Sequence, residues 1–181
     1  MAICAFVFST TIGQVPAYKK WRCNGQGVPR TDPCENRWPG IACEEMGGAL
    51  HIIGISISGA NAGGVLPSGL MNLKTLRYLD LSYNAMTSEI PNTISGLFLL
   101  EYLDLSGNKI ENGVPEILGF MPSMKYFICM ACGLDGQLPL SLGFSRTIMG
   151  LQLSNNKLDG TIPTTYGSME GLVYLDVSLN Q

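Results

Sequence analysis

Carboxylates recur at one position of this sequence, in Asp80, Asp104 and Asp176. Two carboxylates held close together can serve as general acid and general base in hydrolysis. Asp80 and Asp104 each lie in a Leu-Asp-Leu-Ser segment, so a repeated structural motif explains them without catalysis. The single histidine, His51, has no recognisable triad or metal partner, and no phosphate-binding loop is present. We therefore predict that the chain is not an enzyme and needs no cofactor or metal.

A Cys-x-x-Cys pair, Cys129 and Cys132, is the second candidate for chemistry. Such pairs occur in redox-active dithiols and in zinc sites. No second ligand pair accompanies this one, and neither does a nearby histidine. The sequence therefore favours a structural role for both cysteines.

Aromatic residues also recur, at Tyr78, Tyr102, Tyr126 and Tyr174, with Gly150 interrupting the series. Beside this column, Ile128 and Met130 stand where neighbouring copies have Asp and Ser. If these residues lie on adjacent strands about 5 Å apart, the tyrosines join into one patch. Exposed aromatic patches are typical of binding surfaces.

The element that must position these residues is a repeat of 24 residues. Prolines fall at this spacing at Pro67, Pro91, Pro115, Pro139 and Pro163. Two apolar columns keep the same step, one running through Leu79 and Leu103 and the next through Leu81 and Leu105. Alternation in Leu79-Asp80-Leu81 predicts a short strand with both leucines buried. A fixed period in this range predicts a stacked solenoid, in which each coil is stabilised by its neighbours.

A polar column follows each predicted strand. Side-chain amides there can pair with backbone groups of adjacent coils and form a hydrogen-bonded ladder. The column consists of Asn84, Asn108, Cys132, Asn156 and Asn180. Cys129 thus occupies a buried leucine position, and Cys132 occupies a ladder position. We expect both to be buried free thiols.

The repeats resemble plant-type leucine-rich repeats, of the pattern L-x-L-x-x-N-x-L-x-G-x-I-P. Residues 151–163, LQLSNNKLDGTIP, match this pattern nearly in full, whereas Ala60 and Ser145 depart from it. The resemblance implies an α/β-type horseshoe with a parallel β-sheet on its concave face and about five to six repeats. Residues 49–181 would form these repeats, which end at a ladder position without a closing coil, as in a piece of a longer solenoid.

The segment before the repeats, residues 14–48, is similar to the cysteine-containing N-terminal cap of plant extracellular leucine-rich-repeat proteins. The similarity rests on Asp32-Pro33-Cys34, Trp38, Gly40-Ile41 and Cys43. It implies a disulfide between Cys34 and Cys43, with Trp38 packed over the first strand. Cys23 is left either free or paired with Cys4. A disulfide implies an oxidising compartment, so we expect a secreted or cell-surface protein.

Residues 1–13 contain an apolar stretch that is either a signal peptide or a packed first segment of the domain. The chain has no Asn-x-Ser/Thr acceptor for N-glycosylation, which is unusual for extracellular relatives of this type. No apolar run approaches the roughly 18 residues of a membrane span.

Composition excludes further classes of protein. With 46% hydrophobic and 14% charged residues among 181, the chain is expected to fold as one domain. The net charge of −3 gives no reason to expect nucleic-acid binding, which needs basic surfaces.

The resemblance implies an extracellular recognition module, such as the ectodomain of a receptor-like kinase or receptor-like protein. Its partner would be a protein or peptide ligand, or a co-receptor, bound on the concave face. We predict that site at Tyr78, Tyr102, Asp104, Tyr126, Ile128 and Met130. A secreted inhibitor of a polysaccharide hydrolase, as in polygalacturonase-inhibiting proteins, and a stand-alone scaffold remain alternatives. Tyrosine is also a frequent filler of this column in the family.

Overall fold

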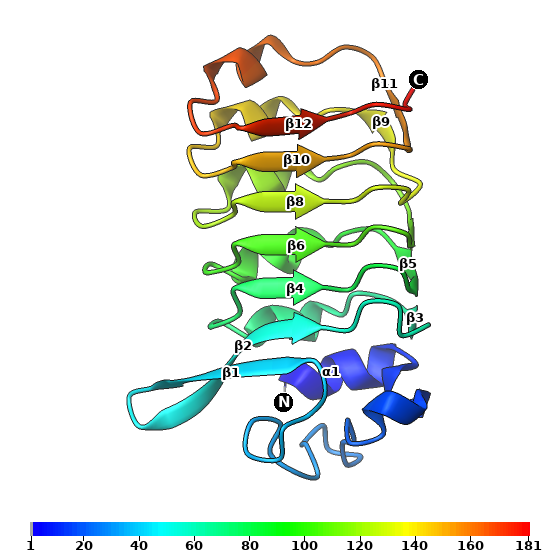
Figure 1. The fold of residues 1–181 in the computed structure, drawn as a ribbon, viewed down its shortest axis with the longest axis vertical. Helices are drawn as coiled ribbons and strands as arrows, with labels where there is room; N and C mark the ends of the chain where they lie inside the picture. Colours follow the sequence, from blue (N-terminus) through cyan, green and yellow to red (C-terminus); the bar gives the residue numbers. More distant parts are fainter. Residues whose placement is uncertain (1) are drawn as a thin grey trace.

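The computed structural model describes residues 2–181 and shows a single stack of coils (Figure 1). One face of the stack is a seven-stranded sheet in the order β1-β2-β4-β6-β8-β10-β12. Its strands are β1 (Ile41–Met46), β2 (Ala49–Ser56), β4 (Tyr78–Asp80), β6 (Tyr102–Asp104), β8 (Tyr126–Ile128), β10 (Gly150–Gln152) and β12 (Tyr174–Asp176). From β2 onward the pairs are parallel. This is a stacked solenoid, as the period predicts, with the concave sheet that the resemblance to leucine-rich repeats implies.

Two features differ from the expected architecture. The sheet is not wholly parallel, because β1 pairs with β2 in antiparallel orientation as a hairpin from the cap. The return segments are not α-helices but five-residue 3-10 helices. They span Ser68–Asn72, Asn92–Gly96, Glu116–Phe120, Leu140–Phe144 and Thr164–Ser168. Each starts after one of the periodic prolines, whose fixed φ and missing N–H suit the first turn of a helix.

A second set of short parallel strands flanks the stack and is called the lateral sheet below. Its first part contains β3 (Gly63–Gly64), β5 (Ala85–Ser88) and β7 (Lys109–Ile110). Its second part contains β9 (Asp135–Gln137) and β11 (Lys157–Asp159). No strand pairing joins β7 to β9 within residues 2–181, so the lateral sheet is broken between them.

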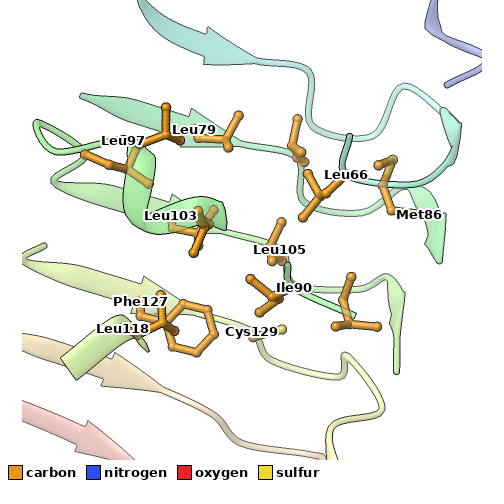
Figure 2. Packing of buried hydrophobic residues seen from close by; sticks show 14 of the residues in the cluster. Leu66, Leu79, Met86, Ile90, Leu97, Leu103, Leu105, Leu118, Phe127 and Cys129 are labelled. Atoms are coloured by element: carbon orange, nitrogen blue, oxygen red, sulfur yellow. The ribbon is translucent and has the colours of Figure 1, made fainter. Parts of the chain in front are cut away.

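The core consists of the two apolar columns seen in the sequence. Leu79, Leu103 and Phe127 are fully buried at the centres of their strands. Leu105 and Cys129 continue the second column, and Ile90 and Leu118 pack from the return side (Figure 2). The strand period therefore fixes which side chains enter the core, and the intervening ones face out on the concave sheet.

Asparagine side chains connect the coils behind this core. The amide of Asn108 donates to the carbonyls of Leu81, one coil earlier, and Leu105, in its own coil, at 2.9 and 2.8 Å. Its Oδ1 accepts the backbone N–H of Met86 at 2.9 Å. Equivalent bonds are made by Asn84, Asn156 and Asn180.

The ladder changes at Cys132, and here the expectation of free thiols is wrong. Cys129 and Cys132 are buried but joined by a disulfide, with Cα atoms 5.5 Å apart. The turn after β8 brings both side chains to one side, which register alone did not reveal. Cys132 Sγ lies 3.3 Å from the Leu105 carbonyl oxygen, but a disulfide sulfur has no proton to donate. The Cys132 carbonyl itself accepts the N–H of Ile110 at 2.9 Å, at the break in the lateral sheet.

The cap covers the first coil with two disulfides. Cys34 is bonded to Cys43, and Cys23 is bonded to Cys4 of helix α1 (Ala2–Ser9). Trp21 and Trp38 are buried and stack with ring centroids 5.8 Å apart. Helix α1 packs closely on Gly69, where a Cβ would lie 2.5 Å from Ala5 Cβ. The described part of the candidate signal peptide, residues 2–13, thus takes part in the folded cap.

Candidate functional site

The tyrosine column lies on the concave sheet in strict register. Tyr78 pairs with Tyr102, and Tyr102 pairs with Tyr126, along β4, β6 and β8. The rings of Tyr78 and Tyr102 stack with centroids 4.4 Å apart and planes 12° apart. Tyr102 and Tyr126 are tilted, with centroids 6.3 Å apart. Tyr78 and Tyr126 are 39% and 38% exposed, so the three rings form one accessible aromatic surface, called the tyrosine patch below.

Asp104 fixes the middle ring of the tyrosine patch. The Tyr102 hydroxyl donates to Asp104 Oδ2 at 3.3 Å, while Asp104 Oδ1 accepts the Ser106 N–H at 2.9 Å. Burial, followed by the negative charge of Asp104, raises the pKa of Tyr102 well above its ordinary value. The hydrogen bond to Asp104 therefore orients the hydroxyl of Tyr102.

Ile128 does not offer the exposed apolar surface expected of it. Its side chain is only 8% exposed, and Met130 is half-buried. Ile128 pairs with Asp104 on one side and Gln152 on the other, within a sheet that has strands on both sides. The Met130 N–H also donates to Ser106 Oγ at 3.1 Å. The accessible part of the predicted site is therefore the tyrosine patch rather than the apolar step beside it.

Gly150 gives the tyrosine patch its far boundary. A Cβ on Gly150 would lie 2.8 Å from Cδ1 of the Tyr126 ring, so this ring occupies the space above β10. The Tyr126 hydroxyl lies 4.0 Å from the sulfur of Met149. Tyr174, although exposed, is separated from the patch by this strand.

Sequence reasoning missed several exposed aromatic residues, of which Tyr83 follows a strand of the concave sheet; the others are Phe98, Phe120 and Phe144. Tyr83 is 64% exposed and follows β4, with its ring against Gly107 in the next coil. Its column holds glycine, alanine, asparagine and leucine in other copies, so periodicity gave no signal. The structure alone reveals this exposed ring beyond the end of β4.

The carboxylates of the recurring aspartates accept hydrogen bonds from the serine that follows each strand. Asp80 Oδ1 accepts the N–H and the hydroxyl of Ser82 at 3.0 and 2.6 Å. Asp176 does the same with Ser178, whose hydrogen bonds lower the pKa of Asp176. Carboxylates committed to such turns are ill suited to proton transfer. Across residues 2–181 no three acidic, histidine or cysteine side chains gather as a metal site.

Comparison with known proteins identifies the repeat type. Residues 55–110 match the family model described as leucine rich repeat. Protein STRUBBELIG-RECEPTOR FAMILY 5 of Arabidopsis thaliana is 33% identical over 85 residues, which are 47% of this chain and 11% of that protein. The chain thus spans about a tenth of the length of this relative.

Solved structures of Arabidopsis receptors share the whole fold. A chain of the BIR3–SERK2 complex superposes with a TM-score of 0.80 at 24% identity, covering 99% of this chain and 92% of that one. The ectodomain of the receptor kinase GASSHO1/SCHENGEN3, solved with CASPARIAN STRIP INTEGRITY FACTOR 2, gives a TM-score of 0.83 at 24% identity. That match covers 100% of this chain and 21% of the other. No helix within residues 2–181 has the length and apolar character to cross a membrane.

Proposed function

Because this chain is a leucine-rich repeat protein with the fold of plant receptor ectodomains, we propose that it binds a protein or peptide ligand through the tyrosine patch on its concave sheet. The observation that carries the proposal is the continuous row formed by Tyr78, Tyr102 and Tyr126. Partly exposed tyrosines supply large contact area with little conformational entropy to lose on binding.

The sheet is well suited to an extended ligand. Its outward side chains are held in register, and Tyr102 is fixed by the hydrogen bond to Asp104. A surface whose side chains are already ordered loses less entropy on association. The same fold is found in the receptor kinase HAESA, solved with a peptide hormone ligand, and in the BIR3–SERK2 complex.

The protein is proposed to work outside the cell, secreted or exposed at the cell surface. Three disulfides support this location, since such bonds persist in oxidising compartments. All six cysteines of the sequence are used in these bonds.

The proposal can be tested without a known ligand. A phage-displayed library of unstructured peptides is selected on the immobilised protein, and binders are titrated against variants. Tyr102→Ala and Tyr126→Ala should each weaken binding at least tenfold, in keeping with the loss of a buried aromatic anchor of about 2 kcal/mol. Lys157→Glu, an exposed change on β11 of the lateral sheet, serves as the control.

Folding of each variant is checked by circular dichroism and melting temperature. If the selected peptides bind both tyrosine variants normally and lose affinity for the Lys157→Glu variant, the site is not on the concave sheet. If no peptide is selected above background, the tyrosine patch does not bind extended peptides.

A further inference from the structure

The tyrosine column lacks a ring at its first position. Gly54 on β2 pairs with Tyr78, at the place where the following strands carry tyrosine. A cavity of about 390 Å³ opens here at the surface, over β1 and β2 of the cap hairpin and beside the start of β4. This volume falls within the range of small-molecule sites. Its lining includes Ala42, Ile53, Gly54, Ser56, Arg77 and Tyr78.

One wall of this cavity is an aromatic ring with a free face. Tyr78 stacks on Tyr102 through the face turned toward β6, with centroids 4.4 Å apart. Because the planes are nearly parallel and β2 lies on the other side of β4, the opposite face of Tyr78 is turned toward Gly54. The stack therefore ends at a cavity rather than at another side chain.

The second glycine of the column does not leave such a space. At Gly150 the ring of Tyr126 already fills the position, because its Cδ1 would lie only 2.8 Å from a Cβ placed there. At Gly54 the nearest atoms to a Cβ are Ala42 Cβ at 3.1 Å and Tyr78 Cβ at 3.7 Å, so no ring atom covers it. The two interruptions of the same column are thus different in kind.

The polar groups at the cavity already have partners. Arg77 is paired with Glu44 at 3.0 Å, and the Ser56 hydroxyl donates to Asp80 at 3.3 Å. A charged ligand would have to compete for these groups. The remaining lining is glycine, alanine and isoleucine, which favours an uncharged apolar occupant.

We propose that this cavity is a pocket for one aromatic side chain of the ligand, which stacks on Tyr78 and completes the row of rings. The inference rests on the proposed binding face and names the chemistry it selects. Stacked aromatic pairs contribute beyond simple burial, by an amount equivalent to about a two- to tenfold gain in affinity. The pocket should therefore prefer an aromatic over an aliphatic side chain of similar size.

The test uses N-acetyl-L-tyrosinamide as the aromatic probe and N-acetyl-L-leucinamide as the aliphatic one. Each is titrated into ¹⁵N-labelled protein while amide shifts are followed by NMR. The aromatic probe should shift the amides of Gly54, Ser56 and Tyr78 in a saturable way and bind two- to tenfold more tightly than the leucine probe. Tyr78→Phe should keep this preference, and Tyr78→Leu should abolish it while keeping an apolar wall.

Tyr174→Ala, which changes an exposed tyrosine four strands away on the same sheet, should leave both titrations unchanged. Equal affinities for the two probes on the unchanged protein, or an aromatic preference that survives Tyr78→Leu, would overturn the pocket. So would shifts centred on other strands. The two probes report only on the pocket at Gly54. If they do not bind, the peptide-binding test with the Tyr102 and Tyr126 variants is unaffected. If that peptide-binding test fails, the result with the probes still holds.

Discussion

Replacing Asn108 by alanine tests the ladder at its most buried asparagine. Asn108 is only 6% exposed and makes three short bonds, two donated to carbonyls and one accepted from a backbone N–H. The alanine variant leaves the Met86 N–H and the Leu105 carbonyl without this partner, whereas the Leu81 carbonyl still accepts from Asn84 at 2.9 Å. Each buried unsatisfied group costs about 1–3 kcal/mol. Partial relaxation reduces the sum for these two groups, so we expect a loss of roughly 2–4 kcal/mol in the free energy of unfolding.

Asn180 supplies a matched control. Its side chain makes the same bonds, to Leu158 N–H at 3.0 Å and to the Leu153 and Val177 carbonyls at 3.0 and 2.9 Å. It lies in the last coil and is partly exposed, so water can replace the lost amide. Asn180→Ala should therefore lower the free energy of unfolding by only about 1 kcal/mol.

The assay is urea unfolding followed by far-ultraviolet circular dichroism, with the midpoint and the slope fitted for each variant. Midpoints that fall equally for Asn108→Ala and Asn180→Ala would refute the reasoning, because burial would then not decide the cost. An unchanged midpoint for Asn108→Ala would show that the ladder contributes no net stability.

Three further predictions concern the disulfides, Tyr166 and the backbone at Ser88. Paired Cys→Ala replacements should destabilise in order of loop length, by about 3.3, 2.7 and 1.9 kcal/mol in thermal unfolding, for the pairs Cys4–Cys23, Cys34–Cys43 and Cys129–Cys132. Burial and Glu116 raise the pKa of Tyr166, so the unfolded chain loses this proton first and stability falls as the pH rises above about 10. Tyr166→Phe should flatten that fall in urea midpoints between about pH 9 and 11, and an unaltered slope would contradict it. Ser88 has φ of 75°, so Ser88→Gly should raise the melting temperature, whereas Ser95→Gly within a 3-10 helix should lower it.

The repeat period predicts most of the fold because every coil of a solenoid has the same local structure. The 24-residue step was enough to place Leu79 and Leu103 in the core and the tyrosines in one register. Side-chain tilt is not periodic, and for this reason neither the burial of Ile128 nor the lean of Tyr126 over Gly150 could be predicted.

The cysteines show a different limit of sequence reasoning. The similarity of the cap implied the bond between Cys34 and Cys43, whereas the partner of Cys23 stayed open. The partner of Cys23 is Cys4 in helix α1, and the place of this helix in the cap is set by long-range packing. Cys129 and Cys132 were interpreted as substitutes in a leucine and an asparagine column, which is true of their positions but overlooks the turn that joins them.

The break in the lateral sheet bears on how the solenoid can bend. Between β6 and β8 the concave sheet is continuous, but on the flank β7 and β9 are not paired. The return segments of the two coils nevertheless stay in close contact, because the Ser141 hydroxyl donates to the Glu116 carbonyl at 2.8 Å. The flank also keeps the bond from the Ile110 N–H to the Cys132 carbonyl. Curvature should therefore differ little at this junction, and a long ligand would meet one ordered surface across Tyr102 and Tyr126.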